Sequence, residues 1–237
     1  MSDSWSIEPI ARITTDFSEK FGLPRQSGLV KSLKGIIAFE PKYSNADALR
    51  GLEGFSHLWI IWGFSESVGK EWFPTVRPPR LGGNIKMGVF ATRSPFRPNS
   101  LALSVVKIEK IDLQAVNGPL IFVSGVDMKS GSPIFDIKPY IPYADSLPDA
   151  KGGFTDSFEN KRLEVEFPEH LLSLFPEYKQ QVMLDVLSLD PRPSYQDDPD
   201  RIYGIAFAGF DVRFTVKEKK VVVVEVNKTG NENLTVG

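Results

Sequence analysis

Short apolar runs separated by turn residues make up roughly the first 140 residues of this chain, a spacing typical of antiparallel β proteins. Gly, Pro and Asn bound these runs and break any longer helical pattern. The strands expected from the runs are 7–13, 35–39, 57–64, 86–91, 101–111 and 120–123. The pattern therefore predicts a mainly β fold, built as an antiparallel barrel or sandwich.

Two segments give this prediction more detail. The run from His57 to Phe64 is almost entirely apolar, which favours a strand buried on both faces. Asn117-Gly118 separates the last two runs and is a strong hairpin signal, so these strands should pair. A helix is expected at 46–52, with Asn45 as its N-cap.

A change of composition around 149–160 indicates a boundary, because Gly and polar residues interrupt the strand pattern there. We expect a β domain at 1–152, a small α+β domain at 153–228 and a disordered polar tail at 229–237. In the second domain, Pro168 could open a short helix. Helical spacing follows at Tyr178, Val182, Val186 and Leu189.

The helical pattern stops at Asp190-Pro191-Arg192-Pro193. Beyond it, either 202–207 or 212–216 could pair with the run 221–226, with residues 217–220 forming the turn. A short helix packed on a few antiparallel strands is the expected arrangement.

Composition excludes several kinds of chemistry. The chain has no cysteine and only two histidines, His57 and His170, which removes thiol catalysis, disulfides and the usual zinc sites. No metal is therefore expected. The net charge of −2 argues against a uniformly basic nucleic-acid protein but leaves a local basic face possible. No targeting signal or membrane span is recognisable, so we expect a cytoplasmic protein.

The segment 75–99, TVRPPRLGGNIKMGVFATRSPFRPN, has the composition of a binding site. Its arginines lie beside Pro or Gly, where a constrained backbone can aim the guanidinium fork at a phosphate or carboxylate. The alternative is a rigid exposed loop whose arginines only keep the protein soluble. These arginines are Arg77, Arg80, Arg93 and Arg97.

A second polar cluster occupies 127–140. Asp136 and Lys138 alternate with apolar residues, so on a strand they share one face. They form either part of a site or an ordinary ion pair at a sheet edge. Pro24-Arg25-Gln26 has similar ingredients but alone reads as a surface turn. His57 is more typical of a hydrogen-bonded core residue than of a catalyst.

Several long motifs, in order, resemble the TrmO (YaeB, TsaA-like) family of tRNA methyltransferases. They are GLEGFSHLWIIWGF from Gly51, RPPRLGGN from Arg77, GVFATRSPFRPN from Gly88 and DIKPYIPYADSLPDA from Asp136. The motif DPRPSY at 190–195 extends the resemblance to the bacterial two-domain form. The resemblance implies an antiparallel single-sheet β-barrel with a small C-terminal domain.

The same resemblance implies an activity. Members use S-adenosylmethionine to methylate N6 of threonylcarbamoyl-adenosine beside the anticodon of threonine tRNA, and they act as homodimers. Cofactor contacts carried over to this chain come from four segments. They are Pro24, Arg25 and Gln26; Ser65 and Glu66; Arg93 and Leu103; and Gly131, Ser132, Pro133 and Ile134. The family commonly has His-Gln where this chain has Ser65-Glu66, so only a backbone contact would survive there.

Asp136 is the candidate base, or the group that orients the acceptor, with Lys138 and Tyr140 as charge and stacking partners. For the RNA backbone or the threonyl carboxylate we expect Arg77, Arg80 and Arg97. Arg192 and Tyr195 could hold the anticodon loop, although their motif could equally be a helix stop that docks the C-terminal domain.

Two other functions remain open. An RNA-binding barrel without catalysis would explain the arginines, but it would need no pocket for S-adenosylmethionine. Binding of S-adenosylmethionine to the isolated protein separates the two functions. A methyltransferase acting on another RNA or on a small molecule would share the barrel but not the acceptor. The chain has no GxGxxG fingerprint after a strand, which argues against a doubly wound methyltransferase.

Overall fold

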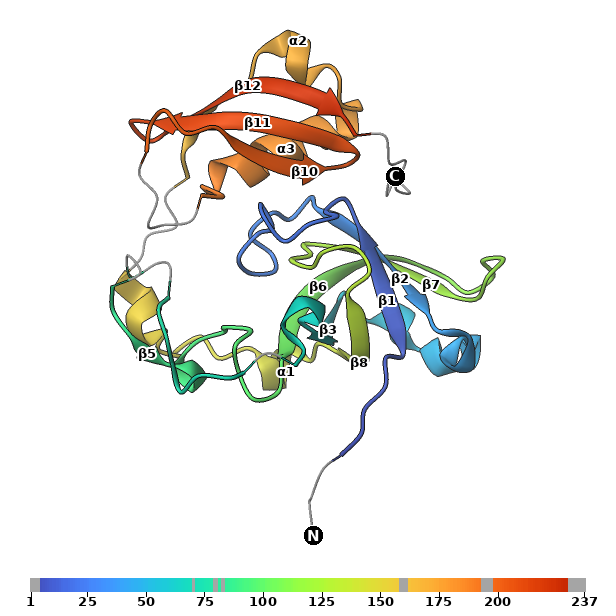
Figure 1. Ribbon diagram of the computed structural model, residues 1–237. Coiled ribbons are helices and arrows are strands. Elements are labelled where there is room, and N and C mark those ends of the chain that lie inside the picture. Colours follow the sequence, from blue (N-terminus) through green and yellow to red (C-terminus); the bar gives the residue numbers. More distant parts are fainter. Residues whose placement is uncertain are drawn as a thin grey trace.

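In the computed structural model, an antiparallel β-barrel is joined to a smaller α+β region (Figure 1). The structure describes residues 5–69, 71–78, 81, 84–157, 162–192 and 198–229. The barrel closes in the order β1-β2-β7-β6-β3-β8. Its strands are β1 (Ala11–Thr15), β2 (Lys34–Phe39), β3 (His57–Gly63), β6 (Leu101–Asp112), β7 (Leu120–Ser124) and β8 (Pro133–Pro139). The predicted mainly β fold is confirmed, and it is a barrel rather than a sandwich.

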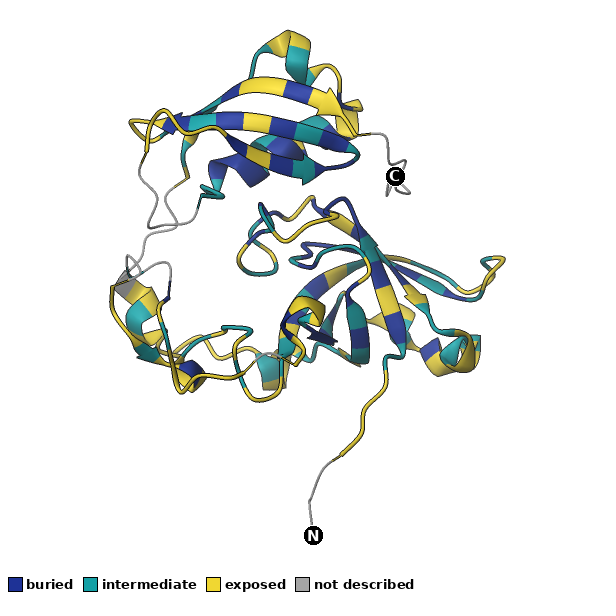
Figure 2. Ribbon diagram, in the orientation of Figure 1, coloured by how far each residue is buried: buried dark blue, intermediate teal, exposed yellow. Residues whose placement is uncertain are grey.

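Alternation along the strands builds the barrel core, as the banding in Figure 2 shows. In β3, Leu58 and Ile60 are fully buried, whereas the intervening Trp59 and Ile61 are only half-buried. The prediction that this strand is buried on both faces was therefore wrong. Its outward residues lie on the outside of the barrel, where only part of their surface is covered.

The predicted hairpin is present, since β6 and β7 pair with Asp112 opposite Leu120. Gly118 in its turn has φ +99°, a conformation that glycine adopts without strain. The expected first strand begins later, at Ala11. The expected helix at 46–52 is instead two 3₁₀ turns, Ala46–Leu49 and Leu52–Gly54, and the side chain of Asn45 caps the first by accepting from the Asp47 amide.

The expected strand at 86–91 is mostly absent. β5 is Met87–Gly88 and pairs with β4 (Thr75–Val76), and a 3₁₀ turn, Val89–Ala91, follows. The segment 68–100, called the excursion below, projects away from the barrel strands (Figure 1). Among its described residues, β5 therefore has β4 but no barrel strand as a partner. The remaining short elements before residue 158 are η1 (Pro41–Tyr43), η4 (Ser65–Ser67), α1 (Pro142–Asp145) and η7 (Gly153–Ser157).

In the C-terminal region the sheet order is β10-β11-β12-β9, with β9 parallel to its neighbour β12. The elements are β9 (Glu164–Glu166), α2 (Glu169–Leu172), α3 (Glu177–Ser188), β10 (Tyr203–Phe207), β11 (Phe210–Lys217) and β12 (Lys220–Lys228). Both candidate strands for the final hairpin form, and β11 and β12 pair through the predicted turn. The predicted α+β character is confirmed. The limits 1–152 and 153–228 stay predictions, and the predicted tail lies, except for Thr229, outside the described residues.

The two parts of the molecule meet at the connection between β1 and β2, residues 16–33. Figure 1 shows α3 and β10 facing this connection. Phe17 at its start packs edge-on against Phe207 of β10, with ring centroids 5.2 Å apart. Buried residues of both parts belong to one continuous hydrophobic cluster. The interface is therefore packed like a core.

Candidate functional site

The expected cofactor loop, Pro24-Arg25-Gln26, belongs to the 16–33 connection. Pro24 is buried, Gln26 is half-buried and Arg25 is exposed. The loop is fixed against β6, because the hydroxyl of Ser27 accepts a hydrogen bond of 3.2 Å from the Val105 amide. β7 pairs with β6 only from Lys107 onward, so the loop takes the place of a neighbouring strand.

Gln26 also joins this loop to the arginine-rich excursion. Its side-chain oxygen accepts a hydrogen bond from the Arg93 guanidinium, and its amide nitrogen donates to the Arg25 carbonyl at 2.5 Å. Two segments far apart in the sequence are thus brought together as expected. An arginine held by a neighbour is a preorganised partner for a carboxylate.

Asp127 lies near Ser27 of the loop and near Arg93, and it was not among the predicted site residues. Its carboxylate accepts a 2.7 Å hydrogen bond from Ser104, whose oxygen in turn accepts one of 3.0 Å from the Trp62 indole. Burial raises the pKa of Asp127 to about 6, against the opposing effects of Ser104, the Ser27 amide and the positive charge of Arg93. A perturbed carboxylate where several loops converge is typical of a functional site.

A signal for Asp127 exists in the sequence. Ser104 is a polar residue within an apolar strand, and its side chain is 1% exposed, so it requires a buried hydrogen-bond partner. Asp127 comes three residues after the end of the apolar strand β7 and is a polar residue that can be that partner. The partnership itself depends on strand register, which composition does not supply.

The loop 127–132 leads into β8 and carries the next group of expected contacts. Ser132 and Ile134 are buried, and their backbone groups are hydrogen-bonded within the barrel: the Ser132 amide donates to Lys129, and the carbonyls of Ser132 and Ile134 accept from Ile13 and Ile10. Gly131 is exposed with φ +82°, and Pro133 is half-buried. Ser65 and Glu66 lie in η4 after β3, and Glu66 forms a 2.5 Å ion pair with Lys129 of this loop.

Strand register places Leu103 and Asp136 on the same outer face of the barrel. Both are directly opposite Ile61, Leu103 on β6 and Asp136 on β8. Directly paired residues point to the same side of a sheet, and adjacent strands are about 4.8 Å apart, so the two side chains lie roughly 10 Å apart. Leu103 is 51% exposed and offers an apolar surface beside a carboxylate.

Asp136 and Lys138 do share a face, and they form an ion pair of 2.8 Å. This pairing raises the pKa of Lys138 through its hydrogen bond to Asp136. Among the described residues, β8 pairs with β1 only at Pro133 and Ile134, so Asp136 and Lys138 lie in the part of β8 that is paired with β3 alone. Tyr140 packs against Trp59, with ring centroids 5.9 Å apart, and a hollow of about 300 Å³ opens beside Lys138.

The predicted RNA-binding arginines have different surroundings. Arg77 is exposed and Arg97 half-buried, in an excursion that also exposes large aromatic side chains. These are Trp72 (45% exposed), Phe73 (53%), Phe90 (74%) and Phe96 (40%). Arg80 lies outside the described residues. Exposed rings between cationic groups suit unstacked bases on a phosphate backbone.

The C-terminal motif is arranged differently. Arg192 is largely buried and directs its guanidinium to the Asp190 carboxylate at 2.8 and 3.0 Å. Asp190 has φ +51°, a strained conformation for a residue with a side chain. This arrangement supports the reading of the motif as a helix stop. Tyr195 lies outside the described residues.

No group of three or more His, Asp or Glu side chains in the described part of the chain could hold a metal ion. No helix there is long and apolar enough to cross a membrane.

Comparison with known proteins gives matches along almost the whole chain. The family model of the tRNA-methyltransferase O N-terminal domain matches residues 12–146, and that of the TrmO C-terminal domain matches 160–229. The tRNA (adenine(37)-N6)-methyltransferase of Escherichia coli K12 is 41% identical, over 91% of this chain and 94% of its own length. RcsF of Pseudomonas aeruginosa, named as a candidate S-adenosylmethionine-dependent methyltransferase, is 38% identical over 88% of this chain and 91% of its own.

Solved structures agree with these relatives. A crystal structure of TrmO from Pseudomonas aeruginosa is 32% identical and superposes with a TM-score of 0.77, covering 96% of this chain and 99% of that one. Sequence, barrel and C-terminal region are therefore all similar to proteins of one kind. The chain belongs to the TrmO family of tRNA methyltransferases.

Proposed function

We propose that this protein uses S-adenosylmethionine to methylate N6 of adenine 37 in tRNA, and that the acceptor is the threonylcarbamoyl form of that adenosine in threonine tRNA. One observation carries the proposal. Ser104, Ser27 and Arg93 lie around Asp127, and strand register puts Asp136 on the same barrel face as Leu103.

The residues present fit such a cofactor. Arg93, held by Gln26, suits the carboxylate of the amino acid end, and the acceptor oxygens near Asp127 suit its ammonium. Leu103 offers apolar surface for adenine, and the backbone at Gly131 and Pro133 is accessible. When bound, S-adenosylmethionine supplies an electrophilic methyl group, so the protein has to place two reactants rather than provide a nucleophile.

Asp136 is the group proposed to take or direct the proton of the acceptor nitrogen. Its ion pair with Lys138, 2.8 Å, and the hydrogen bond from the Ile137 amide, 2.9 Å, fix its orientation. An ionised carboxylate accepts a proton without first losing one. Tyr140, which packs on Trp59, is the proposed stacking partner of the acceptor nucleobase.

The excursion 68–100 is the proposed RNA surface. Arg77, Arg80 and Arg97 would bind phosphates or the threonyl carboxylate, and the exposed aromatic residues would stack on bases of the anticodon loop. Arg192 and Tyr195 belong to this proposal only if the DPRPSY segment reaches the RNA. We further propose that the protein acts in the cytoplasm and that it is a homodimer. Light scattering on purified protein would test the homodimer.

The test is transfer of radiolabelled methyl to two matched threonine tRNAs, one with threonylcarbamoyl-adenosine beside the anticodon and one without. Label in the modified tRNA alone supports both the reaction and the acceptor. Label in neither, with cofactor binding retained, points to another acceptor. Failure to bind S-adenosylmethionine together with tight tRNA binding would favour a non-catalytic RNA-binding barrel.

A further inference from the structure

We propose that the C-terminal α+β region is a structural part of the cofactor site, because it holds both cofactor loops in place from behind. Lys179, Asp16 and Arg162 are the positioning residues of this support. The inference rests on the proposed function, since it concerns the loops assigned there to S-adenosylmethionine. It gives the C-terminal region a role that does not require contact with RNA.

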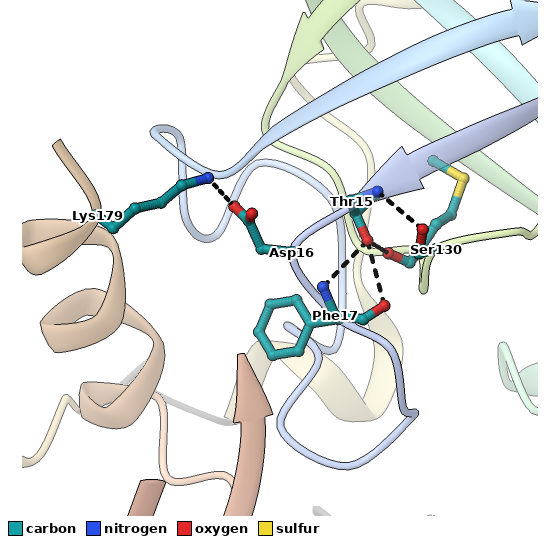
Figure 3. Close-up of polar contacts among 6 residues, drawn as sticks. Thr15, Asp16, Phe17, Ser130 and Lys179 are labelled. Atoms are coloured by element: carbon teal, nitrogen blue, oxygen red, sulfur yellow. Dashed lines mark hydrogen bonds and ion pairs between the residues drawn. The ribbon is translucent and has the colours of Figure 1, made fainter. Parts of the chain in front are cut away.

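The first contact is a buried ion pair across the interface. Lys179 of α3 reaches Asp16, the first residue after β1 (Figure 3). The two side chains are 2% and 1% exposed, so the pair is shielded from water. The Asp16 carbonyl also accepts a 2.8 Å hydrogen bond from the Ala208 amide, which lies in the turn between β10 and β11. The start of the 16–33 connection is thus fixed by two elements of the C-terminal region.

The same point is tied to the second cofactor loop. Thr15 donates through its hydroxyl to the Met128 carbonyl at 3.0 Å and through its amide to the Ser130 hydroxyl at 3.4 Å (Figure 3). The Ser130 amide donates to the Phe17 carbonyl at 2.7 Å. A displacement of Asp16 therefore acts on loop 127–132 as well as on the connection.

Further contacts follow along the connection. Arg25 donates to the backbone carbonyls of Asp190 and Arg192 at 3.3 and 3.2 Å. Arg162 donates to the Leu29 carbonyl at 2.9 Å. The C-terminal region thus contacts the connection at its start, near its middle and toward its end, on both sides of Gln26.

These contacts matter because the connection contains no helix or strand within the described residues. A loop without regular structure samples many conformations unless neighbouring groups restrict them. Apparent ligand affinity falls in proportion to the fraction of molecules whose loop is in the binding conformation. Loosening the interface should therefore weaken cofactor binding even when no tRNA is present.

The experiment compares variants of the full chain without tRNA. Lys179→Met breaks the buried pair, and Arg162→Gln removes an interface contact without leaving a buried charge. Lys220→Met is the control, because Lys220 forms its ion pairs with Glu164 and Glu166 inside the C-terminal sheet, at 3.3 and 2.7 Å. Calorimetry gives the Kd for S-adenosylmethionine, and amide hydrogen exchange follows residues 17–30 and 127–132.

We expect the Kd for S-adenosylmethionine to rise about tenfold in Lys179→Met and several-fold in Arg162→Gln, because a smaller fraction of the molecules has its loops in the binding conformation. Exchange should accelerate in both loops while the barrel strands stay protected. In a separate turnover assay with tRNA added, the kcat at saturating cofactor should change less than the KM for S-adenosylmethionine. The control should match the wild type in every readout.

Two results would overturn the inference. Wild-type Kd and loop exchange in folded Lys179→Met and Arg162→Gln proteins would remove the supporting role and leave the proposed function intact. A wild-type protein that binds no S-adenosylmethionine would remove the proposed function, and the inference with it.

Discussion

Removal of one partner from the Asp16–Lys179 pair has a large and calculable effect on stability. Lys179→Met leaves Asp16 buried without its cation, and among the described residues one Asp16 oxygen already has no hydrogen-bond partner. Breaking a buried pair from one side costs about 3–5 kcal/mol. Burial raises the pKa of Asp16, so protonation of the lone carboxyl limits this cost.

The pH dependence of this variant has a definite sign. With the Asp16 pKa in the folded state above its value in the unfolded chain, the folded state holds the proton more tightly. The contribution of Asp16 to the stability of Lys179→Met is therefore fully present at low pH and is lost as the pH rises through the folded-state pKa of Asp16. The loss relative to wild type should be larger at pH 8 than at pH 5.

Urea unfolding is the assay, with a cycle of Lys179→Met, Asp16→Asn and the double variant. All four tryptophans, at positions 5, 59, 62 and 72, precede the C-terminal region, so fluorescence reports the barrel and circular dichroism reports both parts. The double variant should cost less than the two single variants together, by about 1–3 kcal/mol. A loss below about 1 kcal/mol for Lys179→Met at every pH would refute the reasoning.

Three further predictions concern the site. The pKa of Asp127 is raised from 3.8 to about 6, which corresponds to about 3 kcal/mol of stability that is present at low pH and lost as the pH rises through 6. Asp127→Asn should remove this step from the pH profile of the free energy of unfolding. An unchanged profile would exclude Asp127 as its source. Asp136→Asn should lower kcat at least about tenfold with little change in Kd for S-adenosylmethionine, and full turnover would exclude Asp136 as the base. Arg77→Ala should weaken tRNA binding and reduce the slope of log K against log salt by about one, whereas Arg213→Ala, on the C-terminal sheet, should leave the slope unchanged.

Local signals in the sequence were sufficient for much of the fold. Asn117-Gly118 predicted its hairpin because the conformation of a tight turn depends on its own residues. The strand predicted at 86–91 was wrong for the opposite reason. An apolar run becomes a strand only where a neighbour supplies hydrogen bonds, and among the described residues of the excursion only β4 does so.

The candidate site was less accessible from sequence. That Asp136 and Lys138 share a face followed from simple alternation, and the structure pairs them. The partnership of Asp127 with Ser104 and the alignment of Leu103 with Asp136 depend on register between distant strands. The ion pair of Asp16 with Lys179 also could not be predicted, because it joins the end of β1 to helix α3, which is far away in the sequence.

The row formed by Leu103, Ile61 and Asp136 faces outward, because the barrel interior is filled with apolar side chains. A convex wall cannot enclose a small reactant by itself. Under the proposed function, the anticodon loop would cover that wall and keep water from the transferring group. An isolated nucleoside should then be a poor acceptor even if it carries every reacting atom.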